Sequence, residues 1–358
     1  GLGDVYKRQM KCTIQNIADH LGLSRNTVSK ALKNSSEVSE NTRNLVIKTA
    51  SKLGYKNATF ATPVIPASET DSNGTILFLT RTYASDSEFW TTVLRGIESI
   101  LSNANYHLAI SIMSDSDLKQ LNFPQTISDS SIKGIILVEI CDKVVCDALS
   151  QFNLPIVSVD MPNVPFEELN GIDVVTMESK KNLKKIINQL IEKGAESFGF
   201  VGDLYSTNVS RGFQERYNAL SECLAEHQLP LNQKNCLLHQ TPEDFRNFQT
   251  TVNNLQAMIS LPDVFICGND WTAIQLIYAL QFLGFQIPKD ICVVGFDNIP
   301  AASRISPSLT TISTPQKYLG IAAARQILER IQHPNCPHVF CQYETELIIR
   351  NSTNITSF

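Results

Sequence analysis

The side chains with the clearest chemistry lie early in the chain, in the stretch SRNTVSKAL that begins at Ser24. An arginine can form two hydrogen bonds with guanine and an asparagine two with adenine, and each such pair gives roughly 1–3 kcal/mol of discrimination between bases. Arg25 and Asn26 stand at the start of an expected helix, the end that enters the major groove of DNA in known motifs. Ser29 and Lys30 share their outward face. These residues could read bases, whereas an ordinary surface helix is the alternative.

Two short helices are expected to position these side chains. Thr13 can cap the first helix, in which apolar residues recur at i, i+3, i+4 and i+7. Gly22 then supplies a turn, and Ser24 can cap the second helix. The apolar residues that should face each other are Ile14, Ile17, Ala18, Leu21, Val28, Ala31 and Leu32. Two helices joined by a tight turn that contains glycine predict a helix-turn-helix.

A third helix is expected from Ser39 to about Leu53, where it would close a small core. With the helices before it, VSENTRNLVIKTASKLGY resembles the DNA-binding headpiece of the LacI/GalR family of bacterial repressors, over residues 13–55. The resemblance implies that Arg25, Asn26 and Lys30 read bases. Further candidates for DNA contact are Thr13, Ser24, Thr27, Ser29, Asn34 and Tyr55. Most family members have arginine where Lys30 stands, and lysine lacks the planar fork, so we expect looser base selectivity there.

Charge and composition indicate a basic amino-terminal segment followed by an acidic remainder of the chain. Residues 10–56 carry eight Lys and Arg side chains against three Asp and Glu, although the 358-residue chain has a formal net charge of −5. This distribution is expected when only one end meets phosphate. No apolar run could span a bilayer and residues 1–9 lack the core of a signal peptide, so we expect an intracellular protein without a membrane partner. The resemblance implies a bacterial cytoplasmic, nucleoid-associated protein. Residues 1–9 precede Met10 and are expected to be a remnant, with a basic arm as the competing idea.

Nine cysteines are scattered singly without a CxxC pair, which indicates free thiols in a reducing compartment. Four possible zinc ligands gather near the end of the chain, and they are His333, Cys336, His338 and Cys341. Their spacing matches no common zinc site, and HPNCPHVFC is typical of a connection between a helix and a last strand. We therefore expect neither a bound metal nor another cofactor.

Residues 57–73 lose hydrophobic periodicity and contain two prolines, which predicts a linker after a headpiece of residues 10–56. In the family that the headpiece resembles, this region holds a short hinge helix that inserts a leucine into the minor groove of operator DNA. Here Pro63 falls inside the corresponding segment, where a helix would lose about 3 kcal/mol, and Val64 stands at the leucine position. Both departures disfavour the hinge helix and the DNA kink that accompanies it.

From Gly74 onward, short apolar runs alternate with amphipathic stretches, which predicts an α/β fold of parallel sheets with helices on both faces. The expected strands are 75–80, 107–113, 134–140, 155–160, 197–202, 264–267 and 292–296. The expected helices lie near 88–103, 143–151, 179–193, 211–227, 243–259, 271–283 and 316–331. These are too many strands for one lobe. We expect two similar lobes around a cleft, with a boundary near 161–172 and a second crossing near 295–325.

Residues 74–358 resemble the effector-binding and dimerisation domain of the same repressors, which is similar to type I periplasmic sugar-binding proteins. The motifs that carry the resemblance are FWTTVLRGIES, PIVSVD, FQERYNAL, VFICGNDWTAI, VVGFDNIPAASRISPSLTTIS and TELIIRNST. Two departures concern positions where the family often has Asp-Asn and a glycine. Here Met177-Glu178 and Ala219 stand at those positions, which points to a ligand other than those of the familiar sugar repressors.

Residues at the carboxyl ends of the expected strands are the candidates for ligand contact, because open parallel sheets bind ligands there. Asn269, Asp270 and Asp297 offer acceptors for adjacent hydroxyl groups, and Arg216 offers a planar fork of donors. Asp160 is a further acceptor. A flat apolar wall could come from the aromatic candidates, which are Phe89, Trp90 and Trp271. The mixture suits a small polyol, although the aspartates could instead cap helices, the arginine could be a solvated charge and Trp271 could be packing.

Together these features predict a ligand-responsive transcriptional regulator, acting as a repressor, that binds a pseudo-palindromic operator as a homodimer. Its effector is expected to be a small saccharide, with a nucleobase or a protein co-effector as the alternative. A solute-binding protein without a regulatory role would require a signal sequence and no headpiece. An enzyme is not expected, because no phosphate-binding glycine loop follows a strand and Cys267 and Asp270 lack an evident base partner. A tetramer is not expected, because the chain ends at Phe358, just past the last expected strand.

Overall fold

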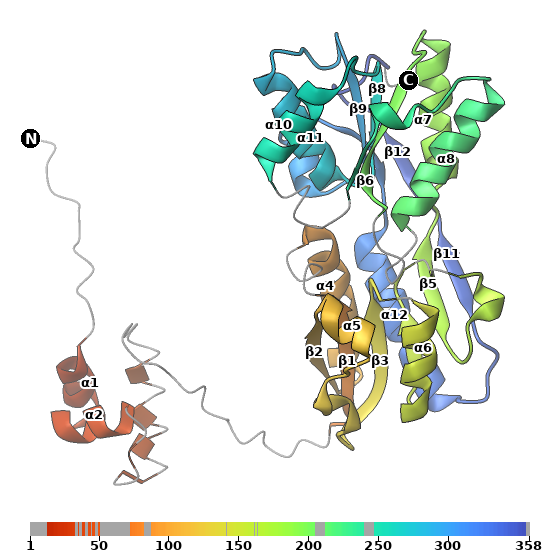
Figure 1. The fold of residues 1–358 in the computed structure, drawn as a ribbon. Helices are drawn as coiled ribbons and strands as arrows, with labels where there is room; N and C mark the ends of the chain where they lie inside the picture. The colour runs from red at the N-terminus through yellow and green to blue at the C-terminus, as the bar shows by residue number, and fades with distance from the viewer. Residues whose placement is uncertain are drawn as a thin grey trace, which may run out of the picture. The chain divides into compact units, whose positions relative to one another are not determined.

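A computed structural model of the chain forms two compact units, residues 1–71 and 72–358, and each is described by itself (Figure 1). The structure describes residues 13–32, 35, 38–39, 42–43, 45–46, 49–50, 72–81, 87–140, 142–160, 162, 164–204, 212–239 and 247–355. Within these ranges no helix is both long enough and apolar enough to cross a membrane.

The first unit contains the expected helix-turn-helix, formed by α1 (Ile14–Leu21) and α2 (Arg25–Leu32). Thr13 caps α1 through a reciprocal pair of hydrogen bonds with Asn16, and Gly22 ends the helix with φ of 65°, a conformation that favours glycine. Ser24 Oγ accepts a hydrogen bond from the backbone N–H of Thr27, which caps α2. The periodicity of the sequence therefore predicted both helices and their caps.

A small hydrophobic core joins these helices to the segment that follows them. Its buried members are Ile17, Ala18, Val28, Ala31, Val38, Val46 and Ala50. Residues 42–43, 45–46 and 49–50 are helical, in agreement with the third helix expected there. Asn34, Tyr55 and residues 57–71 of the expected linker, including Pro63 and Val64, lie outside the described residues.

The second unit is built on two parallel sheets, the first in the order β11-β5-β4-β3-β1-β2 and the second in the order β12-β10-β9-β8-β6-β7. The first holds β1 (Gly74–Arg81), β2 (Tyr106–Met113), β3 (Ile132–Val138), β4 (Ile156–Ser158), β5 (Asp173–Met177) and β11 (Phe340–Tyr343). The second holds β6 (Phe198–Asp203), β7 (Leu237–His239), β8 (Val264–Cys267), β9 (Cys292–Asp297), β10 (Thr310–Ser313) and β12 (Glu346–Ile348). Among these strands β12 alone pairs antiparallel, with β10.

Helices cover both faces of each sheet, as the alternation in the sequence predicted (Figure 1). They are α4 (Glu88–Asn103), α5 (Asp115–Gln120), α6 (Lys143–Leu149), α7 (Lys181–Glu192), α8 (Gly212–Glu226), α10 (Phe248–Ala257), α11 (Asp270–Phe282) and α12 (Gln316–Gln332). Short 3₁₀ turns lie at Gln125–Ser128, Ser150–Phe152, Phe166–Glu168, Gln233–Asn235 and Pro300–Ser303. On the first sheet, α4 and α12 pack on one face and α5 and α6 on the other. On the second sheet, α7 and α8 oppose α10 and α11.

The chain passes between the sheets three times, after β5, between β10 and α12, and between β11 and β12. We expected the first passage near residues 161–172, and the structure places it after Met177. The reason is β5, an unexpected strand that pairs with β4 and extends the first sheet before the chain leaves it. The later passage, between Ser313 and Gln316, falls within the expected interval of 295–325.

Helices α4 and α12 cross so closely that only glycine fits at the contact. A Cβ atom added to Gly96 would lie 2.2 Å from the backbone oxygen of Lys317, and one added to Gly320 would lie 2.0 Å from that of Val93. Real side chains do not tolerate such distances, so the two backbones touch without an intervening layer of side chains.

A buried ion pair joins the start of β5 to the end of α12. The Arg330 guanidinium donates to both carboxylate oxygens of Asp173, at 3.0 and 2.8 Å, and also to the backbone oxygens of residues 334, 336 and 337. Burial acts to raise the pKa of Asp173, but hydrogen bonds from Arg330 and Val339 outweigh it and lower that pKa. His338 Nδ1 lies 3.5 Å from the same carboxylate, and the described residues contain no cluster that could hold a metal ion.

Replacing Arg330 by Met should lower the free energy of unfolding by about 3–5 kcal/mol, because Asp173 would remain as a buried carboxylate without its cation. Urea denaturation at neutral pH, followed by circular dichroism, measures the loss. Lys181→Met removes only an exposed ion pair with Glu344 and serves as the matched control, which should leave the unfolding midpoint almost unchanged. Similar midpoints for the two variants would contradict the prediction.

Candidate functional site

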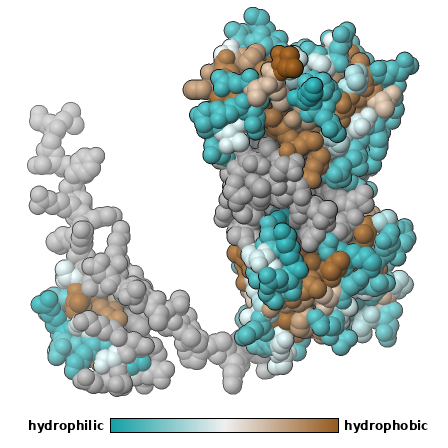
Figure 2. Space-filling view, in the orientation of Figure 1, coloured by the Kyte–Doolittle hydropathy of each residue, from teal (hydrophilic) through white to brown (hydrophobic). Residues whose placement is uncertain are grey.

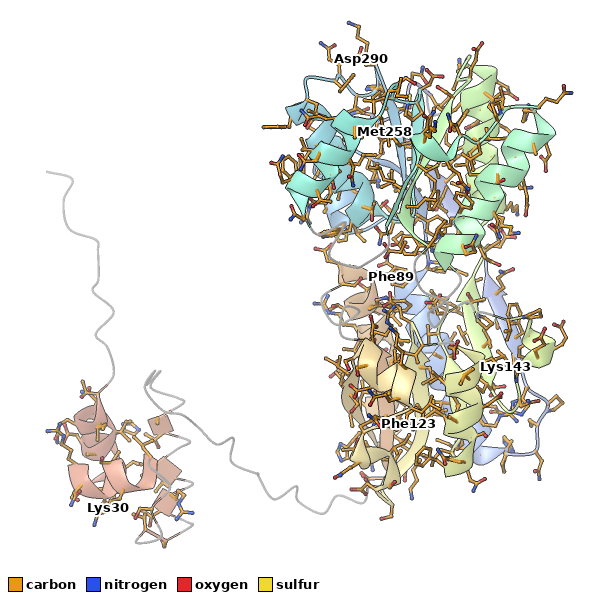
Figure 3. All side chains as sticks on the ribbon, viewed as in Figure 1. Lys30, Phe89, Phe123, Lys143, Met258 and Asp290 are labelled. Carbon is orange, nitrogen blue, oxygen red and sulfur yellow. The ribbon has the colours of Figure 1, made fainter. Side chains whose placement is uncertain are left out.

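Helix α2 presents the expected DNA-reading face of the first unit. Ser24, Arg25 and Asn26 are exposed at its amino end, while Val28 is buried against α1. Thr27, Ser29 and Lys30 are half-buried along the same helix, and Figure 3 labels Lys30 on it. The structure therefore brings all the described candidates of α2 onto one short helix.

In the second unit, the carboxyl ends of strands from both lobes meet the amino ends of α4 and α8. Phe89 and Trp90 begin α4, and Figure 3 places Phe89 at the boundary between the two lobes. Asp160 follows β4, Arg216 lies in the first turns of α8, and Asp297 ends β9. These five residues are buried, so the fold gathers most of the expected ligand candidates into one region.

Trp90 is held by a carboxylate that the sequence analysis missed. Its indole Nε1–H donates to Glu139 Oε1 at 2.6 Å, and its ring packs edge-on against Phe89 with centroids 4.6 Å apart. Glu139 directly follows β3 in a left-handed conformation, with φ of 57°. Burial raises the pKa of its carboxyl against the hydrogen bond from Trp90. The expected strand ran to Ile140 and placed Glu139 inside it, which hid a residue at the end of a strand.

Arg216 lies on an aromatic platform of the second lobe. Its guanidinium carbon is 3.6 Å from the centre of the Phe296 ring and 5.5 Å from that of Phe213. Its Nη1 donates to the backbone oxygen of Gly268. Burial lowers the pKa of Arg216, while the carboxylates of Asp297 and Asp160 oppose that shift. Arg216 is therefore a buried cation rather than the solvated charge that was the alternative.

Asp160 and Arg216 approach each other across the lobe boundary at the start of α8. A Cβ atom added to Gly212 would lie 3.6 Å from Arg216 Nη2 and 3.9 Å from Asp160 Oδ1. One atom comes from the first lobe and the other from the second, so opposite charges of the two lobes come close where α8 begins.

Asp297 ends β9 in a conformation that favours glycine, with φ of 114°. Its backbone oxygen accepts hydrogen bonds from Gln316 Nε2 at 2.6 Å and from Thr314 Oγ1 at 3.2 Å, which fix the turn. Burial raises the pKa of Asp297 well above its usual value, against the attraction of Arg216. A carboxylate with this environment would gain from a ligand that donates hydrogen bonds to it.

Two other candidates have structural roles at the start of α11, and a third, Trp271, lies beside them. Asn269 Oδ1 caps the helix by accepting from the backbone N–H of Thr272 at 2.9 Å. Asp270 is fully buried and accepts from Thr311 Oγ1 at 2.5 Å and from the backbone N–H of Ile299 at 2.9 Å. Trp271 is 40% exposed. Asp270 thus does not cap a helix, which was the alternative, but links the start of α11 by hydrogen bonds to β10 and to the segment after β9.

Burial raises the pKa of Asp270 to about 7, against the hydrogen bonds from Thr311 and Ile299. The folded protein therefore holds this proton more tightly than the unfolded chain, whose aspartates titrate near 3.9, and stability should fall as pH rises from about 4 to 7. Asp270→Asn should reduce that slope, as measured by thermal unfolding across the pH range. The exposed Asp147→Asn is the control and should retain it. An unchanged slope in Asp270→Asn would show that the carboxyl is ionised in the folded state.

Comparison with known proteins gives two family matches. Residues 13–57 match the model of bacterial regulatory proteins of the lacI family, and residues 187–353 match that of a periplasmic binding protein-like domain. The ribose operon repressor of Haemophilus influenzae is 28% identical over 345 residues, which cover 95% of this chain and 98% of the relative. The HTH-type transcriptional repressor PurR of Photobacterium profundum is 26% identical with the same coverage.

A solved structure shares the fold. The lac repressor dimer bound to operator and the anti-inducer ONPF superimposes with a TM-score of 0.66 at 20% identity, over 96% of this chain and 99% of that one. Helix-turn-helix and two-lobed body thus occur in the same order as in repressors that match along almost their whole length. The chain thus joins a segment that matches the lacI family of bacterial regulatory proteins to a periplasmic binding protein-like domain, and it is similar over 95% of its length to transcriptional repressors.

Proposed function

We propose that this protein is a DNA-binding transcriptional repressor whose hold on its operator is controlled by a small molecule in the cleft between the lobes. The observation that carries the proposal is the exposure of Arg25 and Asn26 at the amino end of α2, in a chain whose second unit has the fold of ligand-binding repressors. Its curated relatives are transcriptional repressors, and the lac repressor structure holds both operator and a small molecule. The protein would act in the bacterial cytoplasm, where its DNA lies.

Arg25, Asn26 and Lys30 are the residues that we assign to base recognition. The first two can each form a paired set of hydrogen bonds with a purine edge, and the amino end of α2 is the end that such helices insert into the major groove. Capping by Ser24 fixes where α2 begins, so that Arg25 and Asn26 always stand in its first turn. Contacts with the phosphate backbone of the DNA would come from Thr13, Ser24, Thr27, Ser29, Asn34 and Tyr55.

Arg25→Ala should weaken operator binding by roughly 1–3 kcal/mol in each half-site, because a bidentate contact with guanine is lost. An operator can be selected from a random DNA pool with the purified protein and then measured by fluorescence anisotropy. Lys143→Ala, which removes one positive charge from α6 of the second unit, is the matched control and should bind as the parent does. Equal affinity of Arg25→Ala and the parent would remove Arg25 from the recognition surface.

The effector would lie among Phe89, Trp90, Asp160, Arg216 and Asp297. These residues combine an aromatic wall with a few convergent acceptors and one planar donor, the mixture that small polyols require. Asn269, Asp270 and Trp271 would contribute from the start of α11, chiefly by fixing its position. A ligand that binds one arrangement of the lobes more tightly shifts the equilibrium toward it, with couplings of typically about 1–3 kcal/mol.

Enzymatic activity is not part of the proposal, because the two nucleophile candidates are not accessible to a substrate. Cys267 is buried at the end of β8, and burial raises the pKa of its thiol well above the usual value. Both oxygens of Asp270 are occupied by hydrogen bonds from the protein. A solute-binding protein without a regulatory role would have no use for the headpiece.

We further propose that the protein binds its operator as a homodimer joined through the second unit. An exposed aromatic stripe runs along α11, where Tyr278 is 43% and Phe282 is 68% exposed, and Phe248 of α10 packs edge-on against Phe282. Figure 2 shows apolar residues at the surface over these two helices. On the first lobe, edge strand β2 exposes Ile110 and Ile112. Large exposed apolar side chains of this kind mark interaction surfaces, and a twofold dimer would pair the stripe with its own copy.

Phe282→Glu combined with Ile110→Glu should convert the dimer to a monomer, because two carboxylates would be buried against their own copies at the interface. Sedimentation velocity gives the mass in solution. Val144→Glu, on the exposed face of α6, tests the effect of an added charge alone and should leave the dimer intact. A double variant that still sediments as a dimer would place the interface elsewhere.

A further inference from the structure

A pocket of about 510 Å³ lies in the second lobe, away from the boundary between the lobes. It is formed by the end of α10, the residues after α11 and the segments that lead into β8 and β9. The expected effector residues lie instead at the carboxyl ends of strands, and β9 spans six residues, or roughly 20 Å. Figure 3 labels Met258 and Asp290 in the region of the pocket and Phe89 at the lobe boundary. The pocket is therefore separate from the proposed effector site.

Apolar side chains supply most of the lining. Leu255 and Ile291 are buried, and Met258 and Phe285 are half-buried. Ile259 also lines the pocket and is 96% exposed, more than any other large hydrophobic side chain that the structure describes. An apolar ligand would remove this side chain from water, which favours binding.

Two aspartates line the same pocket, and the protein fixes one oxygen of each. Asp290 Oδ2 accepts a hydrogen bond from the backbone N–H of Gln286 at 2.7 Å. Asp263 Oδ2 accepts from the backbone N–H groups of Glu196 and Ser197, at 3.0 and 2.8 Å. Burial acts to raise the pKa of Asp263, but these hydrogen bonds outweigh it and lower that pKa. Asp263 is therefore an anion at neutral pH.

The second oxygen of each aspartate remains open to a ligand. Within the described ranges, Oδ1 of Asp263 and Oδ1 of Asp290 accept no hydrogen bond, and neither carboxylate has a cation within ion-pair distance. Lys289 precedes Asp290 in the chain and is exposed, but it pairs with neither aspartate. A ligand that brings its own positive charge would complement this part of the pocket.

The size of the pocket favours a small molecule over a protein partner. Sites for small molecules typically measure about 300–1,000 Å³ and combine apolar walls with a few polar groups. A stable protein interface involves roughly 20–30 residues on each side, whereas twelve residues line this pocket.

We propose that this pocket is a second ligand site, which binds a small molecule with an apolar body and a protonated amine. The apolar body lies against Met258 and Phe285 and covers Ile259, while the ammonium group pairs with Asp290. Asp263 adds a second negative charge to the pocket, so an anion of the same shape is repelled. The site is independent of the proposed effector site, because none of the effector candidates lines it.

Methyl NMR of the full-length protein, labelled at its methionine methyl groups, tests the proposal with tryptamine, tryptophol and indolepropionate at neutral pH. These probes share an indole body and differ in carrying an amine, a hydroxyl or a carboxylate. Met258 is the one of the five methionines that lines the pocket, and Met258→Leu assigns its signal. We expect this signal to shift saturably with tryptamine, to respond to tryptophol with at least about fivefold weaker affinity, and not to respond to indolepropionate.

Two variants separate the charge from the apolar contact. Asp290→Asn keeps an oxygen for the N–H of Gln286 but removes the charge, so the preference for the amine should fall below about twofold. Ile259→Ser should weaken both tryptamine and tryptophol by at least about threefold. Asp147→Asn and Val144→Ser, at exposed positions of α6, are the matched controls and should bind as the parent does.

Equal affinities for tryptamine and tryptophol would overturn the assignment of an amine, as would a preference that persists in Asp290→Asn. Saturable binding of tryptamine that shifts another methionine signal but not that of Met258 would place the amine elsewhere in the protein and reject the site. A Met258 signal that stays unchanged up to about 10 mM tryptamine would do the same. Unaltered affinities in Ile259→Ser would remove Ile259 from the site.

Discussion

The Arg216 guanidinium, stacked 3.6 Å from the Phe296 ring, is the charge on which the region between the two lobes depends. It is buried, one of its nitrogens donates a hydrogen bond to the backbone of Gly268, and it lies within electrostatic range of the carboxyl groups of Asp297 and Asp160. A buried guanidinium is tolerated because aromatic faces and carboxylates replace its water. Those partners come from α8, from the residue after β8 and from β9, so the guanidinium links these three elements. The same partners define what a ligand would contact.

Much of the fold could be predicted from local pattern. Helix caps and apolar runs are properties of neighbouring residues. The structure has the caps at Thr13 and Ser24 and the strands β1, β6, β8 and β9 close to the expected positions. Strands β5, β7 and β10 were not among the expected strands, although the equally short β8 was. The misplaced lobe boundary followed from the missing β5, since a sheet cannot be divided correctly when one of its strands is absent.

The site was less predictable because its roles depend on contacts between distant segments. Asp297 could be nominated from its place at a strand end, and Arg216 from its planar fork of donors. Asp270 was nominated on the same grounds, yet its carboxylate is used by Thr311, 41 residues away, and by the backbone of Ile299. Gly295 makes this possible, since a Cβ there would lie 2.2 Å from Asp270 Oδ1. Glu139 shows the converse, because its hydrogen bond comes from Trp90, 49 residues earlier, which no local pattern reveals.

The contact between α4 and α12 at Gly96 and Gly320 has a mechanical consequence. Two helices whose backbones touch have no intervening side chains that could repack when one helix is displaced, so they are expected to move as one rigid unit. One end of α4 holds Trp90, and the first residue of α12 donates a hydrogen bond to the backbone of Asp297 in the other lobe. A displacement applied at these ends would be transmitted along the helix pair to its far end, beside the edge strand β2, which begins three residues after α4 ends.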